Sequence, residues 1–392
     1  MLPPQPRIGL VLPGGAALGA YEAGVVDYVT REIVGEIGGA LRFDVLCGTS
    51  VGAVGATMLG AFADEPWRAA ERLVQLWTSL RVERFIKPDV LGALASFCGC
   101  RGLVHRPGVG GVLDTRQIDR LVREAIPFSR IGVNVRRGLV SAVAVSTTHV
   151  ASGHTIVFVQ TDGPIREWSH DRTLVARATR LRPEHVLASA AIPLLFPAMP
   201  IGGELYCEGG LRQNVPLSPA VHLGADRLLV VSPNYVAPPD ERLARAREHA
   251  VSGPVFLLGR MLNALLLDRI DADLERLEQV NELVAVAQPR PTAHRPRLRT
   301  VEPLLVRASR SIGMMAADYV RQPRFVRRGV VPRLLRQLAA AEGTAEADLV
   351  SYLLFDGDFA AELIALGRSD ARAQHDQLCA LFAPYAERRA AR

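Results

Sequence analysis

The sequence contains almost no lysine. Of its 46 basic residues, one, Lys87, is lysine and the rest are arginine, and 40 acids leave a net charge of +6. Arginine binds phosphate and carboxylate groups through two parallel hydrogen bonds and is less strongly hydrated than lysine. The basic excess therefore suits a surface that meets anionic lipid or nucleic acid, and it equally suits charge spread over solvent-exposed helix faces.

Cysteine is also scarce, and no pair has the spacing of a zinc site. The five cysteines are Cys47, Cys98, Cys100, Cys207 and Cys379. Their number is odd, and none of them forms the C-x-x-C pair of a routine structural zinc site. We therefore expect reduced thiols in a cytoplasmic protein that has no metal or other cofactor.

Long hydrophobic runs are missing as well. The first apolar segment, residues 8–12, has only five residues, and no apolar stretch reaches the roughly 20 residues of a membrane-spanning helix. The N-terminus lacks the charged start and long apolar run of a signal peptide. No zinc spacing, basic region with aromatics or RNA-binding strand motif points to nucleic acid. We expect a cytoplasmic protein, with any work on membranes done as a peripheral protein at their surface.

The pattern that is present alternates strands and helices. Residues 8–12 (IGLVL) read as a buried strand that enters a glycine loop, and a helical pattern follows. Residues 43–63 repeat the order strand, tight turn, helix, which predicts a parallel sheet with both faces covered. Further predictions are a helix over 113–127 capped by Asp114 or Thr115, two strands around 138–160, a helix starting at Pro183, a hairpin at Gly202-Gly203 and a strand over 225–233.

The sequence pattern of the chain changes after about residue 236. Helical patterns dominate 240–287 and 332–383, with a basic, proline-rich segment between them. The sequence thus predicts an α/β domain over 7–236 and a helical extension over 237–392. Residues 85–112 are rich in glycine and weakly periodic, which favours an insertion over the sheet that acts as a lid.

The first glycine loop, GGAALG at 14–19, is not a nucleotide-binding motif. A P-loop needs lysine after its last glycine, whereas Gly19 is followed by Ala20-Tyr21, and the dinucleotide fingerprint matches only in part. Small residues ahead of a helix leave backbone N–H groups that can stabilise an anion, including a transient oxyanion. A tight turn that needs glycine only for its backbone angles remains the alternative.

A serine stands where a nucleophile is expected. In CGTSVG, residues 47–52, Gly48-x-Ser50-x-Gly52 lies between a predicted strand and a predicted helix, the setting of a nucleophile elbow. The glycines permit close packing around a strained serine, and the N–H of Val51 is a further oxyanion donor. We predict Ser50 as the nucleophile.

The base for this serine is less evident. None of the nine histidines lies in a convincing strand-end loop, and Ser50 comes after only one strand and helix, earlier than in the α/β-hydrolases with their Ser, acid and His order. A histidine triad remains a distant alternative. An acid, Glu208, stands directly before Gly209-Gly210 in YCEGGL.

Three segments together resemble the patatin-like phospholipase family. They are LPGGAALGAYEAGVV at 12–26, FDVLCGTSVGAVGA at 43–56 and LASAAIPLLFPAMPIGGELYCEGGLRQNVPL at 187–217. The resemblance implies a three-layer α/β/α sandwich that hydrolyses acyl esters of lipids through an acyl-enzyme, with no metal required.

On this resemblance, the site residues correspond one by one. It implies that Ser50 is the nucleophile and Glu208 the base, supported by Gly48, Gly52, Gly209 and Gly210. It also implies an oxyanion hole at Gly14, Gly15 and Ala16.

The chain departs from the family pattern at three positions. Glu208 replaces aspartate, Ala16 replaces the third loop glycine, and Leu18 replaces a residue that is often basic. Glutamate adds one methylene, about 1.5 Å of reach, so three interpretations stay open: an active Ser–Glu enzyme, a weakened hydrolase, and a non-catalytic protein that binds lipid or a partner. We expect a lipid or membrane-surface substrate and no nucleic acid; a homo-oligomer remains open.

Overall fold

The computed structural model describes residues 6–37, 41–86, 115–165, 168, 173–193, 196–240, 253–287, 299–342 and 346–390. The predicted cap Asp114 and all of the predicted lid except Phe85 and Ile86 lie outside these residues. No helix in the described ranges combines the length and apolar character that crossing a membrane requires.

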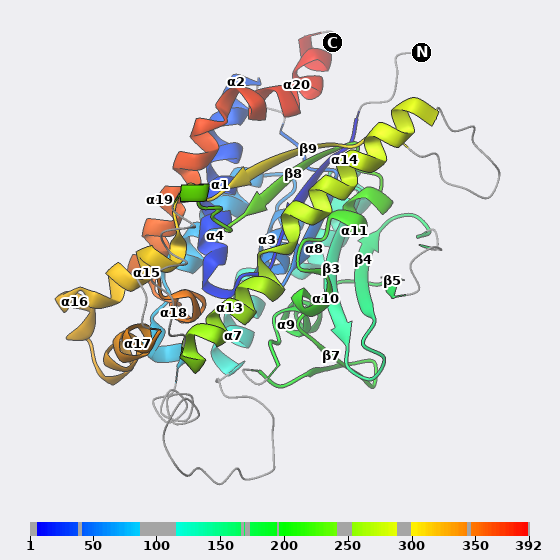
Figure 1. Cartoon of the computed structure of the whole chain (residues 1–392). Helices are drawn as coiled ribbons and strands as arrows, with labels where there is room; N and C mark the ends of the chain where they lie inside the picture. Colours follow the sequence, from blue (N-terminus) through cyan, green and yellow to red (C-terminus); the bar gives the residue numbers. More distant parts are fainter. Residues whose placement is uncertain are drawn as a thin grey trace.

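One mixed sheet forms the centre of the molecule (Figure 1). Its strands are β1 (Ile8–Leu12), β2 (Val45–Thr49), β3 (Ala142–His149), β4 (Thr155–Thr161), β5 (Leu174–Ala178), β6 (Met199–Ile201), β7 (Glu204–Cys207), β8 (Arg227–Ser232) and β9 (Glu302–Arg307). The strand order is β5-β4-β3-β2-β1-β8-β9, and the β6–β7 hairpin joins through β7, which pairs with β3. The pairs are parallel except β3–β4, β3–β7 and β6–β7.

Helices flank this sheet. Those of the first part are η1 (Ala16–Leu18), α1 (Gly19–Tyr28), η2 (Val29–Ile33), α2 (Val34–Glu36), α3 (Val51–Ala61), α4 (Pro66–Thr78), α5 (Val82–Phe85), α7 (Thr115–Ala125), α8 (Phe128–Arg136), α9 (Pro183–Ser189), α10 (Gly210–Gln213) and α11 (Leu217–His222). Those of the C-terminal part are α13 (Pro254–Leu266), α14 (Arg269–Ala287), α15 (Ile312–Arg321), α16 (Pro323–Val326), α17 (Val330–Ala341), α18 (Asp348–Leu353), α19 (Gly357–Ala373) and α20 (His375–Ala390).

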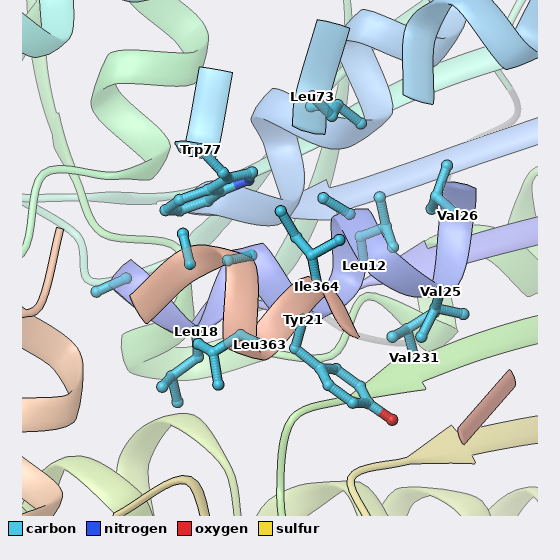
Figure 2. Close-up of a cluster of buried hydrophobic side chains, with 14 of the residues drawn as sticks. Leu12, Leu18, Tyr21, Val25, Val26, Leu73, Trp77, Val231, Leu363 and Ile364 are labelled. Carbon is cyan, nitrogen blue, oxygen red and sulfur yellow. The ribbon is translucent and has the colours of Figure 1, made fainter. Parts of the chain in front are cut away.

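Strand side chains alternate between two hydrophobic cores, which makes the architecture three-layered. On β1, Leu10 and Leu12 enter the larger core, whereas Val11 enters the smaller one on the opposite face. Successive side chains of a strand point to opposite faces, so a strand covered on both sides is apolar throughout. The larger core packs α1, α4 and α19, seen around Trp77 and Ile364 in Figure 2, and the smaller one packs α11 and α14. The expected α/β/α fold with its mostly parallel sheet is confirmed.

The C-terminal part is mostly helical, as expected, but it also adds a strand that the sequence did not predict. β9 pairs in parallel with β8 at the edge of the sheet. It carries Pro303, which an edge strand tolerates, because β8 is the one partner of β9 among the described strands.

Helix α19 of the same part packs directly along α1. At their crossing, a Cβ on Gly24 would lie 2.2 Å from the Ile364 carbonyl oxygen, and one on Gly367 would lie 2.2 Å from the Tyr21 carbonyl oxygen. The two backbones therefore touch through glycine, and the C-terminal part is built into the same core as the N-terminal strands.

Candidate active site

Ser50 occupies a strained turn between β2 and α3. Its φ of 54° and ψ of −123° lie where L-residues are rarely found, and such strain concentrates at functional sites. A Cβ on Gly48 would stand 2.2 Å from the Gly52 oxygen, and a Cβ on Gly52 would stand 2.1 Å from the Leu12 oxygen. The glycines on either side of Ser50 are thus required by close backbone approach, which explains the G-x-S-x-G spacing.

Glu208 reaches Ser50. It follows β7, and its Oε2 accepts a hydrogen bond of 2.9 Å from Ser50 Oγ, while its Oε1 accepts one of 3.0 Å from the Gly210 N–H. Both side chains are buried, at 3% and 1% exposure for Ser50 and Glu208. The added methylene of glutamate therefore does not prevent contact with the serine hydroxyl.

Burial sets the charge state of this acid. Desolvation raises the pKa of Glu208 from 4.5 to about 7, against the hydrogen bonds from the Gly210 N–H and Ser50, which lower it. A carboxyl group with a pKa near neutrality is suited to take up and give back a proton at physiological pH.

The backbone around Glu208 is held from three directions. The Glu208 N–H donates to the Ala191 oxygen at 2.9 Å, and the Thr148 hydroxyl donates to the Glu208 oxygen at 2.8 Å. The adjacent Gly209 lies so close to β3 that a Cβ there would stand 2.3 Å from the Ser146 oxygen. Glu208 therefore starts from a fixed position, and only its side-chain torsions adjust its reach.

Ser189, which the sequence analysis did not single out, supports the serine turn. Its hydroxyl accepts from the Ser50 N–H at 2.7 Å and donates to the Ser146 oxygen at 2.6 Å. The strained turn is thereby tied to the end of β3. The only sequence signal was its place in LASAAIP, between the predicted nucleophile and the acid.

The glycine loop contributes fewer donors than expected. The Gly14 N–H donates to Asn214 Oδ1 at 2.9 Å. In this arrangement it is therefore not free to donate to an oxyanion, the role predicted for it. The N–H groups of Gly15 and Ala16 meet no acceptor in the described part of the chain. Ala16 has a φ of 49°, which costs an L-residue about 1–2 kcal/mol, so the glycine usual at this position would be less strained.

Asn214 is a second residue that the sequence analysis did not place in the site. Besides accepting from the Gly14 N–H, its Nδ2 donates to the Gly14 oxygen at 3.0 Å and to the Leu266 oxygen. Asn214 is 1% exposed and comes from the NVPL run that follows Glu208. It clamps the glycine loop to the segment that carries the acid and to the end of α13.

An apolar cavity of about 80 Å³ begins at Ser50. Ala16, Ser50 and Val51 line it. The glycine loop and the start of α3, the two backbone segments predicted to donate to an oxyanion, therefore both border the cavity. Its other walls include Leu80, Val186, Ile192 and Phe355, all apolar. The arrangement suits a hydrocarbon chain whose carbonyl end lies at the serine hydroxyl.

A larger cavity of about 570 Å³ lies elsewhere, among α13, α15 and α18. Its lining mixes charged and apolar side chains and includes neither Ser50 nor Glu208, so the candidate site lies at the smaller cavity.

Among the described residues, no histidine joins Ser50 and Glu208. No histidine among them hydrogen-bonds to Ser50 or Glu208; His149 pairs with Ser152, and His185 with the backbone of Arg182. Nor does any group of three or more His, Cys, Asp or Glu in this part of the chain have the arrangement of a metal site.

Comparison with known proteins yields one family. The model of the patatin-like phospholipase family matches residues 10–221, more than half of the chain, and this stretch contains the serine turn, the acid and the glycine loop. Among solved structures, the chain is similar to VipD from Legionella pneumophila, with 11% identity, 89% of this chain and 67% of that chain covered, and a TM-score of 0.29. No curated protein matches. The chain belongs to the patatin-like phospholipase family.

Proposed function

We propose that this chain is a serine lipid acyl hydrolase in which Ser50 and Glu208 form a catalytic dyad. The family supports hydrolysis of lipid esters in general. The observation that carries the dyad is the 2.9 Å hydrogen bond from Ser50 Oγ to Glu208 Oε2, made where both side chains are shielded from solvent. An adjacent acid within hydrogen-bonding reach is what a serine hydroxyl needs to become a nucleophile.

In the first step, Ser50 Oγ attacks the ester carbonyl and its proton passes to Glu208 Oε2. The negative charge on the carbonyl oxygen is stabilised by the N–H groups of Gly15, the N-cap residue of η1, and Ala16, its first residue. When the tetrahedral intermediate collapses, the C–O bond breaks, and Glu208 returns the proton to the leaving alcohol. The acyl group remains on Ser50 as an ester.

In the second step, Glu208 acts as a base again. It removes a proton from water, which attacks the acyl carbonyl, and the proton then returns to Ser50 as the fatty acid leaves. The same carboxyl group serves both half-reactions because each begins with its ionised form and ends with it.

The substrate class is an acyl lipid of the phospholipase A, lysophospholipase or esterase type, presented at a membrane surface. Helix α13 supports such contact: Val255 and Phe256 are buried, whereas Leu257 and Met261 are 57% and 51% exposed. An exposed apolar pair on a helix is able to enter the headgroup region of a bilayer. The corresponding localisation is peripheral, at the membrane surface.

The rival function is a weakened or non-catalytic protein that binds lipid or a partner. The replacement of aspartate by Glu208 favours it, because a misplacement of about 1 Å can cost on the order of 100-fold in rate. The buried hydrogen bond to Ser50 argues for the enzyme.

A fluorophosphonate probe, which reacts with activated serines, separates the two functions. We expect covalent labelling of the wild type and of Ser129→Ala, which alters an exposed serine on α8, and no labelling of Ser50→Ala. Mass spectrometry of the labelled peptide should place the adduct on Ser50. Absence of labelling in folded wild-type protein, checked by circular dichroism, would leave the non-catalytic function.

A further inference from the structure

One wall of the cavity beside Ser50 comes from the far end of the chain. Phe355 lies in the turn between α18 and α19 and lines this cavity. Its ring stacks on Trp77 at a centroid distance of 6.4 Å and an interplanar angle of 7°, and it meets Phe85 at 5.7 Å. Trp77 and Phe85 also line the cavity, so three aromatic rings form a continuous wall.

The turn that carries Phe355 is fixed against the corner between α4 and α5. The Gly357 N–H donates to the Leu80 oxygen at 2.9 Å. A Cβ on Gly357 would stand only 2.0 Å from the Thr78 oxygen, so the two backbones are in direct contact. Phe355 is therefore presented to the cavity by a turn with little freedom to move away from Leu80.

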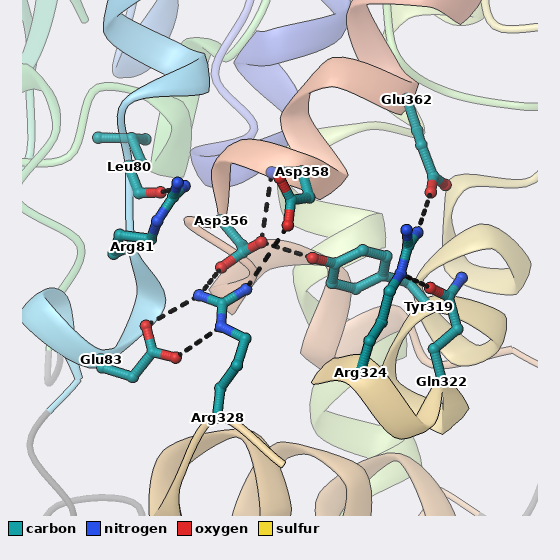
Figure 3. Close-up of polar contacts among 10 residues, drawn as sticks. All are labelled: Leu80, Arg81, Glu83, Tyr319, Gln322, Arg324, Arg328, Asp356, Asp358 and Glu362. Atoms are coloured by element: carbon teal, nitrogen blue, oxygen red, sulfur yellow. Dashed lines mark hydrogen bonds and ion pairs between the residues drawn. The ribbon is translucent and has the colours of Figure 1, made fainter. Parts of the chain in front are cut away.

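A partly buried ionic cluster secures the same turn (Figure 3). Asp356, next to Phe355, is 0% exposed and accepts from the Tyr319 hydroxyl at 2.5 Å and from Arg328 at 2.6 Å. Arg328 also donates twice to Glu83 of α5, at 3.0 Å each. The planar guanidinium thus joins the turn before α19 to α5, with the directional geometry that an arginine fork provides.

We propose that Phe355 limits the length of the acyl chain that the cavity accepts, and that Arg328 and Asp356 are the positioning residues that hold it there. This proposal rests on the proposed function. The cavity of about 80 Å³ holds roughly five to eight water-sized groups. A wall of three fixed rings therefore selects short and medium acyl chains over long ones.

The test is a chain-length profile with p-nitrophenyl butyrate, octanoate and palmitate. We expect the wild type to prefer the shorter esters and Phe355→Ala to raise the palmitate-to-butyrate ratio of kcat/KM by about tenfold or more, since each methylene placed in an apolar pocket contributes at least that order of discrimination. Phe359→Ala is the matched control, because Phe359 is fully buried on α19 but does not line the cavity. An unchanged ratio in Phe355→Ala would overturn the proposal.

The positioning role has its own readout. Arg328→Gln should shift the ratio in the same direction as Phe355→Ala, and Arg328→Lys should restore part of the wild-type ratio because it keeps the charge but not the fork. Arg324→Gln, which alters a neighbouring arginine with a 70% exposed side chain, should leave the ratio unchanged. If Arg328→Gln lowers stability but not selectivity, Arg328 has no positioning role.

A binding measurement on an inactive variant tests the role of Phe355 independently of the proposed hydrolase function. In the Ser50→Ala background, titration calorimetry with octanoate and palmitate should show tighter relative binding of palmitate after Phe355→Ala is added. If no ester is hydrolysed but this shift appears, the hydrolase function fails and the role of Phe355 stands. If esters are hydrolysed and neither readout shifts, the role of Phe355 fails alone.

Discussion

At the scale of single residues, burial gives Glu208 the raised pKa on which its proposed role as a base depends. The acid is withdrawn from water, which raises its pKa to about 7, yet its two oxygens are engaged by Ser50 and the Gly210 N–H. A raised pKa makes the ionised carboxylate a stronger base, but less of it is present at acidic pH. The pH dependence expected of the proposed reaction follows from this balance.

Activity should rise with pH through neutrality. Glu208 has to be ionised before it can accept the Ser50 proton, and its pKa is about 7. We therefore expect kcat/KM to be about tenfold lower at pH 6 than on the plateau above pH 8. Stopped assays with an uncharged ester such as p-nitrophenyl butyrate measure the profile. A rate that is independent of pH between 5 and 8 would show that Glu208 does not act as the base.

Shortening the acid should reduce activity. Glu208→Asp removes one methylene, about 1.5 Å of reach, while the backbone remains held by the Ala191 oxygen and by the contact of Gly209 with β3. The carboxylate would then stand too far from Ser50, and we expect kcat to fall on the order of 100-fold. Glu204→Asp, in the exposed hairpin, is the control. Equal or higher activity in Glu208→Asp would mean that the loop can follow the shorter side chain.

At the scale of elements, the sequence indicated most of the parts near the site but not the contacts between them. Local patterns of apolar residues and glycines were sufficient to predict the strand over 8–12, the serine turn and the hairpin before Glu208. β9 was not predicted, because EPLLVR contains a proline and follows a basic, proline-rich stretch. Its strand character comes from pairing with β8, which is a tertiary effect.

The clamp between the glycine loop and α10 is likewise a tertiary feature. Asn214 and Gly14 are 200 residues apart and exchange two hydrogen bonds. Nothing in the local pattern around either residue signals that contact. The same holds for Ser189 and Ser50, which lie 139 residues apart.

Loss of this clamp should impair both stability and catalysis. Asn214→Ala leaves the Gly14 N–H and C=O without their partner, which should lower the free energy of unfolding by about 1–3 kcal/mol. The loop that carries Gly15 and Ala16 should then lose its alignment, so kcat should fall while KM changes little. Urea unfolding and steady-state kinetics measure the two effects.

Asn134→Ala is the matched control for the clamp. Asn134 is as buried as Asn214 but donates to Gly60 and Ala61, away from the dyad. We expect it to lose stability without loss of kcat in the folded fraction. If both variants lose kcat equally, Asn214 acts through general stability and not through the glycine loop.

At the scale of the whole molecule, the C-terminal part bears on the site through α19. This helix packs on α1, which begins immediately after the loop that contains Ala16. The change to helical patterns after residue 236 was evident from the sequence. That the C-terminal part packs into the same hydrophobic core was not. The boundary between 236 and 237 stays a prediction, whereas β9 and α19 share the sheet and the larger core with the N-terminal strands.

Disturbing the α1–α19 contact should therefore be felt at the site. Gly367→Ala places a Cβ within 2.2 Å of the Tyr21 oxygen, and we expect a loss of about 1–3 kcal/mol in the free energy of unfolding together with reduced esterase activity. Gly35→Ala is the control, because a Cβ there meets nothing within 4 Å. Denaturant unfolding and activity of both variants decide the matter; a fully stable Gly367→Ala would contradict the close contact.

The position of β1 within the sheet also sets the order in which the protein can be completed. β1 is synthesised before the other strands of this sheet, yet it lies between β2 and β8, and β8 in turn pairs with β9. At about 5–20 residues per second, roughly 15–60 s separate the synthesis of β1 from that of β9. During that interval the growing chain presents an unpaired apolar strand edge, the kind of surface that chaperones bind and that aggregates recruit. We therefore expect more soluble protein at lower growth temperature and with co-expressed chaperones.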